Sequence, residues 1–283
     1  MRLSRLRSAF GALSIAAAFF PIGPATQEPT PKPADVLRRV RERARLDSEL
    51  QTHFTYLEQR RDVKISKLGK LTVGPLRTFE VYPSRESGGT YKRLIAIDGV
   101  PLPPAELERR DAEHQQHLRE ETEKRRRESP SQTAARQAAE ERERREREAA
   151  LDDAVALYDT TIVGRERVDG APVLVLNLMP RKDARPSTRQ GRWMKQFSGR
   201  AWISEGDYQI AKLDMHALDD VTIGWGVIGR VHAGSRFVFT RRRFEGAWLP
   251  AEVIFEGTGR TLLFRKFQIR TVTTYWGYRR VKG

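Results

Sequence analysis

The carboxy-terminal half of the chain is a series of alternating apolar runs joined by short turn signals. Acidic residues followed by glycine suit the positive φ angles of tight hairpin turns. Three hairpins follow this pattern: residues 161–168 and 172–179 around Asp169-Gly170, residues 198–204 and 209–217 around residues 205–207, and residues 235–244 and 248–255 around Glu245-Gly246. A last run, residues 262–278, can form one long strand or two. Regular strands with turns between them predict one antiparallel sheet, open or nearly closed.

Several of these strands carry apolar residues on both faces. Because successive side chains of a strand point to opposite faces, Phe237 and Phe239 fall on one face and Val238 on the other. The neighbours Ile254 and Phe255 repeat the pattern. Both apolar faces of such a sheet must be shielded from water. Helices packed inside a curved sheet would cover one of them.

The amino-terminal part supplies one helix and the first strands. Residues 34–50 place Val36, Val40 and other apolar side chains at helical spacing, with Asp35 in the first turn, where an acidic residue favours a helix. Alternating runs follow at residues 54–57, 76–82 and 91–97.

Residues 102–158 form a charge-dense block without an apolar stripe. Residues 115–150 contain one leucine and no aromatic residue, and Glu and Arg recur four residues apart, as in solvated helices. Proline lacks an amide donor and disfavours helix before it, so Pro130 interrupts the block. We predict two solvent-exposed helices, residues 103–128 and 132–158, bent or broken at Pro130.

The amino terminus has the three parts of a secretory signal peptide. Arg2, Arg5 and Arg7 precede an uncharged, small and apolar run at residues 8–23, and Ala25 ends a small-residue cleavage site. The run is shorter than the about 20 residues that a membrane span needs. We therefore predict cleavage near Ala25 and export to the periplasm, with an uncleaved membrane anchor or an organelle presequence as alternatives.

The formal net charge of +15 belongs to the segments that flank the charged block. Inside the block the signs alternate, so the summed field that would attract nucleic acid is small. The predicted export also argues against a nucleic-acid partner. We expect no nucleic-acid partner.

Two hairpins and the first strand carry recognisable motifs. Residues 162–176 place a glycine, then Asp169-Gly170, then an alternating apolar strand. Residues 199–213 place Trp202-Ile203 before a turn and an Ile-x-Lys strand, and the first strand opens with a Phe-x-Tyr pattern at Phe54. This arrangement resembles the outer-membrane lipoprotein carrier superfamily, which includes the lipoprotein-sorting carrier, its outer-membrane receptor and an envelope-stress sensor.

This resemblance covers residues 34–100 and 155–280 and implies a half-barrel with an apolar cavity for acyl chains and no enzymatic activity. The charged block departs from it, because it is longer and more polar than the superfamily's plug helices. The expected fold class is α+β, mainly antiparallel β: a curved open half-barrel sheet with capping helices and a long charged helical insertion. The expected segments are a signal peptide (1–25), the helix and first strands (26–101), the charged insertion (102–158) and the remaining strands (159–283).

Aromatic side chains in the middle of strands are the candidate ligand contacts. We predict Trp202, Phe237, Phe239 and Phe255 as lining of a lipid cavity, because ligand pockets are largely apolar and aromatic. The alternative for each residue is ordinary packing in the core.

Basic side chains are the candidate contacts for an anionic head group. Arg241, Arg242 and Arg243 end a strand beside a turn, and Trp225 lies between glycines, so we predict a head-group or surface contact at these four residues. The alternative is a solvated edge whose charges discourage aggregation. A long basic loop, residues 180–196, is either a membrane or partner contact or a disordered connector.

The sequence offers little catalytic chemistry. The chain has no cysteine and five histidines, which excludes disulfides and thiolate metal sites. His114 and His117 share a helix face and form a candidate metal pair with Glu113, but the helix is expected to be exposed, and Asp152-Asp153 is interpreted as solvated. We expect no metal, no cofactor and no catalytic residue, and a hydrolase is the weakest hypothesis.

Two hypotheses remain. The first is an exported, non-enzymatic protein of the cell envelope that binds an acyl lipid or a lipoprotein in the half-barrel cavity. The alternative is an envelope sensor or interaction protein that uses the half-barrel and the charged helices to bind an envelope protein. A peripheral membrane contact is compatible with both.

Overall fold

The chain divides into two compact units, Met1–Thr30 and Pro31–Gly283, and the fold below belongs to the second. The computed structural model describes residues 29–65, 70–83, 90–223, 229–261 and 266–281. The predicted signal peptide, residues 1–25, and the predicted contact Trp225 lie outside the described residues. Within the described residues, no helix is long and apolar enough to cross a membrane.

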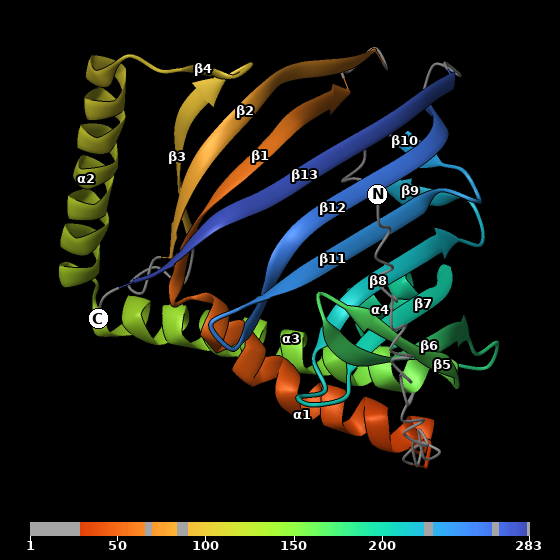
Figure 1. The fold of residues 1–283 in the computed structure, drawn as a ribbon. Coiled ribbons are helices and arrows are strands. Elements are labelled where there is room, and N and C mark those ends of the chain that lie inside the picture. The colour runs from red at the N-terminus through yellow and green to blue at the C-terminus, as the bar shows by residue number, and fades with distance from the viewer. Residues whose placement is uncertain (1–28, 66–69, 84–89, 224–228, 262–265, 282–283) are drawn as a thin grey trace, which may run out of the picture. The chain divides into compact units, whose positions relative to one another are not determined.

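The described strands form one antiparallel sheet (Figure 1). Its strands are β1 Phe54–Ile65, β2 Leu71–Pro83, β3 Thr90–Ile97, β4 Val100–Pro101, β5 Tyr158–Val168, β6 Ala171–Pro180, β7 Phe197–Ser204, β8 Ile210–Ala217, β9 Val221–Ile223, β10 Gly229–Val231, β11 Arg236–Phe244, β12 Ala247–Thr261 and β13 Lys266–Arg280. The main path runs β4-β3-β2-β1-β13-β12-β11-β8-β7-β6-β5, and off this path β10 pairs with β12 and β9 pairs with β10. The end strands β4 and β5 are not paired with each other, so the predicted curved, open sheet is confirmed.

The tight turns explain why the predicted hairpins form. The turns at Asp98-Gly99, Asp169-Gly170 and Glu245-Gly246 each place two successive residues at positive φ, for example 48° and 77° at the second of them. Such turns match the right-handed twist of the flanking strands. The described part of the last long strand is β13, Lys266–Arg280, and residues 262–265 of the predicted strand lie outside the described residues. The short strands β9 and β10 follow β8 in the chain.

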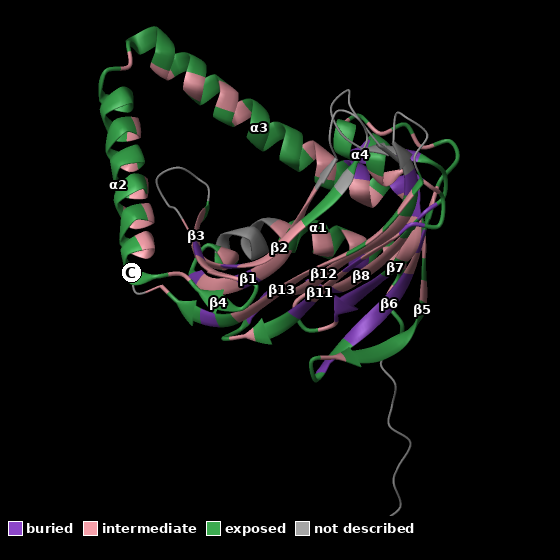
Figure 2. Ribbon diagram, turned by 90° about the horizontal axis from the view of Figure 1, so that it is seen from above, coloured by how far each residue is buried: buried purple, intermediate pink, exposed green. Residues whose placement is uncertain are grey.

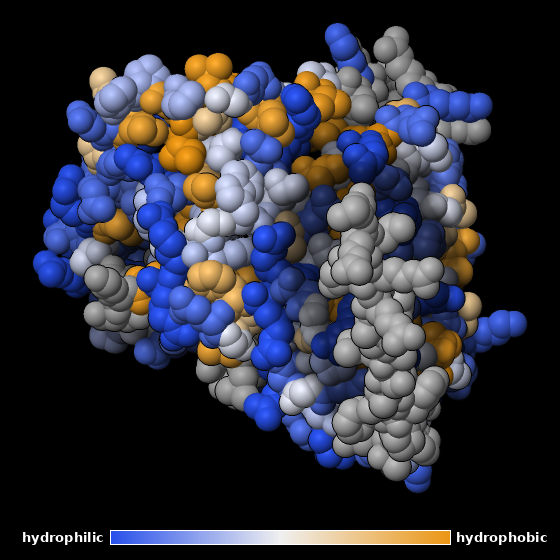
Figure 3. Space-filling view, in the orientation of Figure 1, coloured by the Kyte–Doolittle hydropathy of each residue, from blue (hydrophilic) through white to orange (hydrophobic). Residues whose placement is uncertain are grey.

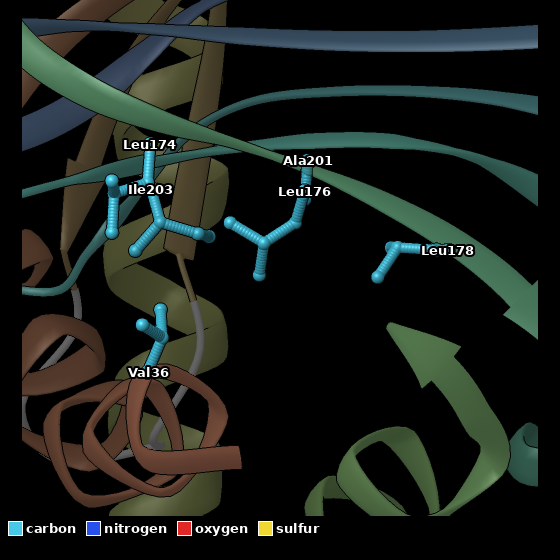
Figure 4. Packing of buried hydrophobic residues seen from close by; sticks show 6 residues of the cluster. All are labelled: Val36, Leu174, Leu176, Leu178, Ala201 and Ile203. Carbon is cyan, nitrogen blue, oxygen red and sulfur yellow. The ribbon is translucent and has the colours of Figure 1, made fainter. Parts of the chain in front are cut away.

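Four helices accompany the sheet in the described part of the chain: α1 Pro33–Gln51, α2 Pro104–Arg126, α3 Pro130–Leu157 and α4 Arg189–Met194. Helix α1 lies inside the curve of the sheet (Figure 2). Its Val36 is fully buried and points toward Leu174 and Ile203 (Figure 4). The predicted helix at residues 34–50 and its capping role are thereby confirmed.

The predicted charged helices are also confirmed, and they extend as two arms that are largely exposed (Figure 2). The break falls at residues 127–129, where the Ser129 side chain caps α3 reciprocally with Gln132 and Pro130 occupies the first turn. No residue of α2 is buried, and in α3 only Asp153 and Leu157 are.

Helix α2 is held against the edge of the sheet by a few polar contacts. Arg93 of β3 donates to Asp111 at 2.6 Å, and the ring of Tyr91 stacks on His114 with centroids 3.6 Å apart. Neither contact buries much apolar surface. The arm therefore derives little of its stability from packing on the sheet.

The sheet buries side chains on both faces, as expected. One cluster, on the face covered by α1, includes Leu174, Leu176 and Ile203. Their strand neighbours Val173, Val175 and Trp202 form a second cluster with Trp248 and Ala211 on the opposite face. The face drawn in Figure 3 is mostly hydrophilic, with hydrophobic side chains in separate small groups.

The two edges of the sheet differ in length. Strand β5 contains a register shift between Ile162 and Gly164, and residues 165–167 beyond it are Arg, Glu and Arg, all exposed. At the other edge, β4 has only two residues, Val100 and Pro101.

Candidate functional site

An apolar cavity of about 290 Å³ lies between the helices and the sheet. Its helical wall is formed by Leu37 and Val40 of α1 and by Ala154 and Val155 of α3. This volume is at the lower end of the range of small-molecule sites, about 300–1,000 Å³.

Part of the sheet wall is one row of side chains across three strands. Register pairs Leu176 with Ala201 and Ala201 with Leu213, and all three line the cavity. Directly paired residues point to the same face of a sheet. Ala201 is 4% exposed and has only a methyl group between two leucines, so this row leaves space where a larger side chain would fill it.

The structure places three of the four predicted aromatic contacts on the cavity face. Phe237 lines the cavity. Phe255 pairs with Phe237 and Phe239 pairs with the lining residue Leu213, so both share that face without lining the cavity itself. Whether any of them contacts a ligand remains a prediction.

The fourth residue, Trp202, lies on the other face. It is adjacent to the lining residue Ala201 and so points away from the cavity. Its indole N–H donates to Glu166 at 2.8 Å, and the ammonium of Lys212 lies 4.2 Å from its ring centroid. These contacts and its 6% exposure give Trp202 a packing role in the second cluster.

The three predicted arginines lie in different environments. Arg241 is buried, donates to the carbonyl of the lining residue Ile210 at 3.1 Å, and lies 5.9 Å from the ring centroid of Phe239. Arg242 and Arg243 are exposed. Arg241 alone of the three therefore contacts a strand segment that lines the cavity.

The cavity reaches the surface beside α4. Trp193 lines the cavity and is 43% exposed, and its ring packs on Phe197 with centroids 4.4 Å apart. The Tyr158 hydroxyl donates to the Met194 carbonyl at 2.9 Å and joins α4 to β5. Burial raises the pKa of Tyr158, so the hydroxyl stays a donor at neutral pH. The basic loop at residues 180–196 thus forms the mouth of the cavity.

One buried carboxylate positions this mouth. Asp153 of α3 accepts hydrogen bonds from the backbone N–H and hydroxyl of Ser187 at 2.9 and 3.2 Å, and from those of Thr188 at 2.7 and 2.6 Å. The Thr188 hydroxyl in turn accepts from Gly191 N–H at 2.9 Å and caps α4. A side chain at Gly191 would overlap the Asp153 carboxylate.

This role corrects the interpretation of Asp152-Asp153 as a solvated pair. Asp152 is exposed and pairs with Arg41 of α1, but Asp153 is 9% exposed. Burial by itself would raise the pKa of Asp153, whereas the hydrogen bonds from Thr188 and Ser187 together lower it below the ordinary value.

We expect Asp153→Asn to loosen α4, because an amide cannot accept at both positions and directs its NH2 toward donors. The loss should be about 1–3 kcal/mol of unfolding free energy, with faster hydrogen exchange at residues 187–195. Asp152→Asn is the matched control and should cost less than about 1 kcal/mol, since its ion pair is exposed. Equal effects of the two variants would contradict the role of Asp153.

The same contact sets a pH dependence. Because the pKa of Asp153 is lower folded than unfolded, its stabilisation is complete above the unfolded value of about 3.9 and is lost as the pH falls through the folded value. The protection factors of the α4 amides, which are corrected for the intrinsic pH dependence of exchange, should therefore fall in acid in the wild type and change less in Asp153→Asn.

Two other features are poorer candidate sites. A hollow of about 1220 Å³ lies between α2 and α3, but its walls are mainly charged and polar residues such as Arg119, Glu123 and Arg127. Among the described residues, no group of three His, Cys, Asp or Glu side chains is placed to hold a metal ion. The apolar cavity is therefore the best-defined ligand site of the described chain.

The fold and the site together define an open antiparallel half-barrel with an apolar cavity under its helices. No protein-family model matches the sequence, and no curated protein matches it either. Solved structures similar to the chain include an outer membrane lipoprotein-sorting protein domain from Vibrio parahaemolyticus, with 10% identity over 87% of this chain and 94% of that chain at a TM-score of 0.31.

Two further solved structures are similar to the chain. LolA superfamily protein NE2245 from Nitrosomonas europaea is 8% identical over 89% of this chain and 95% of that chain, at a TM-score of 0.26. A DUF1329 family protein from Desulfovibrio piger is 10% identical over 87% of this chain and 91% of that chain, at a TM-score of 0.28.

Proposed function

We propose that this protein is an exported, non-enzymatic lipid- or lipoprotein-binding protein of the cell envelope that holds an acyl chain in the apolar cavity. The main support for this proposal is the apolar cavity wall, whose side chains are aliphatic, aromatic or thioether groups. The Tyr158 hydroxyl is already satisfied by its hydrogen bond to the Met194 carbonyl. An acyl chain satisfies such a wall because it needs no hydrogen-bond partner. Phe237 is the ligand contact we retain.

The expected affinity comes from burying methylene groups. Each buried methylene contributes about 0.8 kcal/mol, which is about fourfold in affinity, and association and chain ordering offset part of the sum. For saturated fatty acids of increasing length, we expect affinity to rise about fourfold per methylene until the chain fills the cavity, and then to level off.

Native mass spectrometry of the protein isolated from its own cells, followed by titration with these fatty acids, checks the proposal. A co-purifying acyl lipid would support lipid binding, and absence of uptake for every chain length would refute it. A protein mass equal to that of a chain starting near residue 26 would support cleavage and export. A mass equal to that of the chain with residues 1–25 would refute cleavage.

A second candidate is an envelope sensor or interaction protein that binds a protein partner through the charged arms. The observation that favours it is the exposure of α2, in which no residue is buried and many charges pair with each other, such as Arg109 with Glu106 at 2.7 Å. This candidate predicts that filling the cavity leaves cellular function intact, whereas the lipid-binding proposal predicts that function is lost.

A further inference from the structure

We propose that the mouth segment, residues 181–195, docks the protein on an anionic lipid surface, so that the cavity opens toward the membrane. This inference rests on the proposed function, because it assigns the place where an acyl ligand enters and leaves. Helix α4 lies within the segment, and Trp193 belongs to both the cavity wall and the surface.

The segment is strongly basic. It holds six Lys or Arg residues and one acidic residue, Asp183. Five of the six cations are exposed: Arg181, Lys182, Arg185, Arg189 and Arg192. Lysine and arginine side chains near an anionic bilayer are attracted to it by about 1 kcal/mol each, which corresponds to about fivefold in affinity.

Several of these basic side chains donate hydrogen bonds to uncharged backbone carbonyls. The guanidinium of Arg181 donates to the carbonyl of Ala156 in α3, and that of Arg192 donates to the carbonyl of Ser187 at 3.3 Å. The Lys195 ammonium donates to the carbonyls of Lys182 and Ala184 at 3.0 and 2.7 Å. Carbonyl groups orient a cation without cancelling its charge.

The carboxylates around the mouth are fewer than the cations. Asp219 and Asp220 follow Leu218, which is joined to the segment by a hydrogen bond from its N–H to the Gln196 carbonyl at 2.8 Å. Asp220 lies 3.1 Å from the imidazole of His232. With Asp183 and the buried Asp153, which is bonded to Ser187 and Thr188, they make four acids against six bases, so the mouth keeps a positive excess.

Two exposed apolar side chains lie near these basic residues. Trp193 and Leu218 are each 43% exposed, and the backbone connects them through Gln196, whose N–H donates to the Trp193 carbonyl at 3.1 Å. A tryptophan with basic neighbours suits the interface between head groups and acyl chains. Docking there would let an acyl chain pass between bilayer and cavity with little exposure to water.

The test uses the full mature protein and vesicles of phosphatidylcholine alone or mixed with phosphatidylglycerol. In co-sedimentation, we expect binding to the mixed vesicles, weakened by salt, and much weaker binding to phosphatidylcholine alone. The variant Arg185→Gln/Arg192→Gln removes two exposed charges at the mouth and should weaken vesicle binding by more than about tenfold. The matched control, Arg126→Gln/Arg142→Gln, removes two exposed arginines from the arms and should leave vesicle binding unchanged.

Fatty-acid uptake in vesicle-free solution separates this inference from the proposed function. We expect uptake by Arg185→Gln/Arg192→Gln to equal that of the wild type, since neither residue lines the cavity. No binding of the wild type to either vesicle, or an equal loss in the arm control, would overturn membrane docking. Vesicle binding without fatty-acid uptake would leave the docking surface standing and refute the acyl cavity instead.

Discussion

Replacing Ala201 with leucine is expected to abolish most acyl binding while leaving the protein at least as stable as the wild type. The larger side chain would occupy the space between Leu176 and Leu213, where the cavity row has only a methyl group. It displaces about three methylene groups of a ligand, so affinity should fall by about tenfold or more. Filling an empty apolar space is neutral or stabilising, so the melting temperature should stay or rise.

The two readouts move in different directions, which separates a filled site from a damaged fold. Ala171→Leu is the control, because Ala171 is 5% exposed in the apolar cluster on the opposite face. Overpacking there should cost about 1–3 kcal/mol without changing fatty-acid uptake. Unchanged uptake in a folded Ala201→Leu protein would show that the cavity is not the ligand site.

Gly199→Ala is expected to cause the largest loss of stability of any variant considered. Gly199 lies in β7 between Leu178 and Met215, and a Cβ there would overlap the Asp214 carbonyl and stand 2.8 Å from the Met215 Cα. Both of these atoms belong to the backbone of β8, which cannot relieve the overlap by rotation as a side chain can. We expect a loss of about 3 kcal/mol or more in chemical denaturation.

Gly164→Ala is the matched control in an edge strand. Nothing lies within 4 Å of a Cβ at Gly164, and alanine is favoured over glycine inside a strand by about 0.5–1 kcal/mol. This variant should be neutral or slightly stabilised. Similar losses in both variants would mean that glycine acts through chain flexibility and not through close approach of β7 and β8.

The hairpins were predictable from sequence because their determinants are local. Asp169-Gly170 and Glu245-Gly246 specify their turns within two residues, and the alternation of the flanking strands follows directly. The exposed arms were predictable for a related reason, since a helix without an apolar stripe has nothing to bury.

The cavity was only partly predictable, because alternation separates two faces without saying which one the helices cover. Phe237 and Trp202 are both mid-strand aromatics, yet they lie on opposite faces. That difference depends on the packing of Val36 of α1 against Leu174 of β6, residues far apart in the chain.

Asp153 was missed for the same long-range reason. Its partners Ser187 and Thr188 lie 34 and 35 positions away, and no local pattern connects them. A Thr188-x-x-Gly191 sequence does signal the start of a helix, and that signal was available within the basic loop.

The edges of the sheet bear on how this protein behaves at high concentration. An exposed edge strand is a template for joining copies into fibres. Here β5 is interrupted by its register shift near Gly164 and followed by charged side chains, and β4 ends at Pro101, which offers no N–H. Strand β5 therefore offers no long, flat row of free donors and acceptors, and α2 lies beside the part of β3 that β4 leaves unpaired, so the open sheet resists polymerisation without closing on itself.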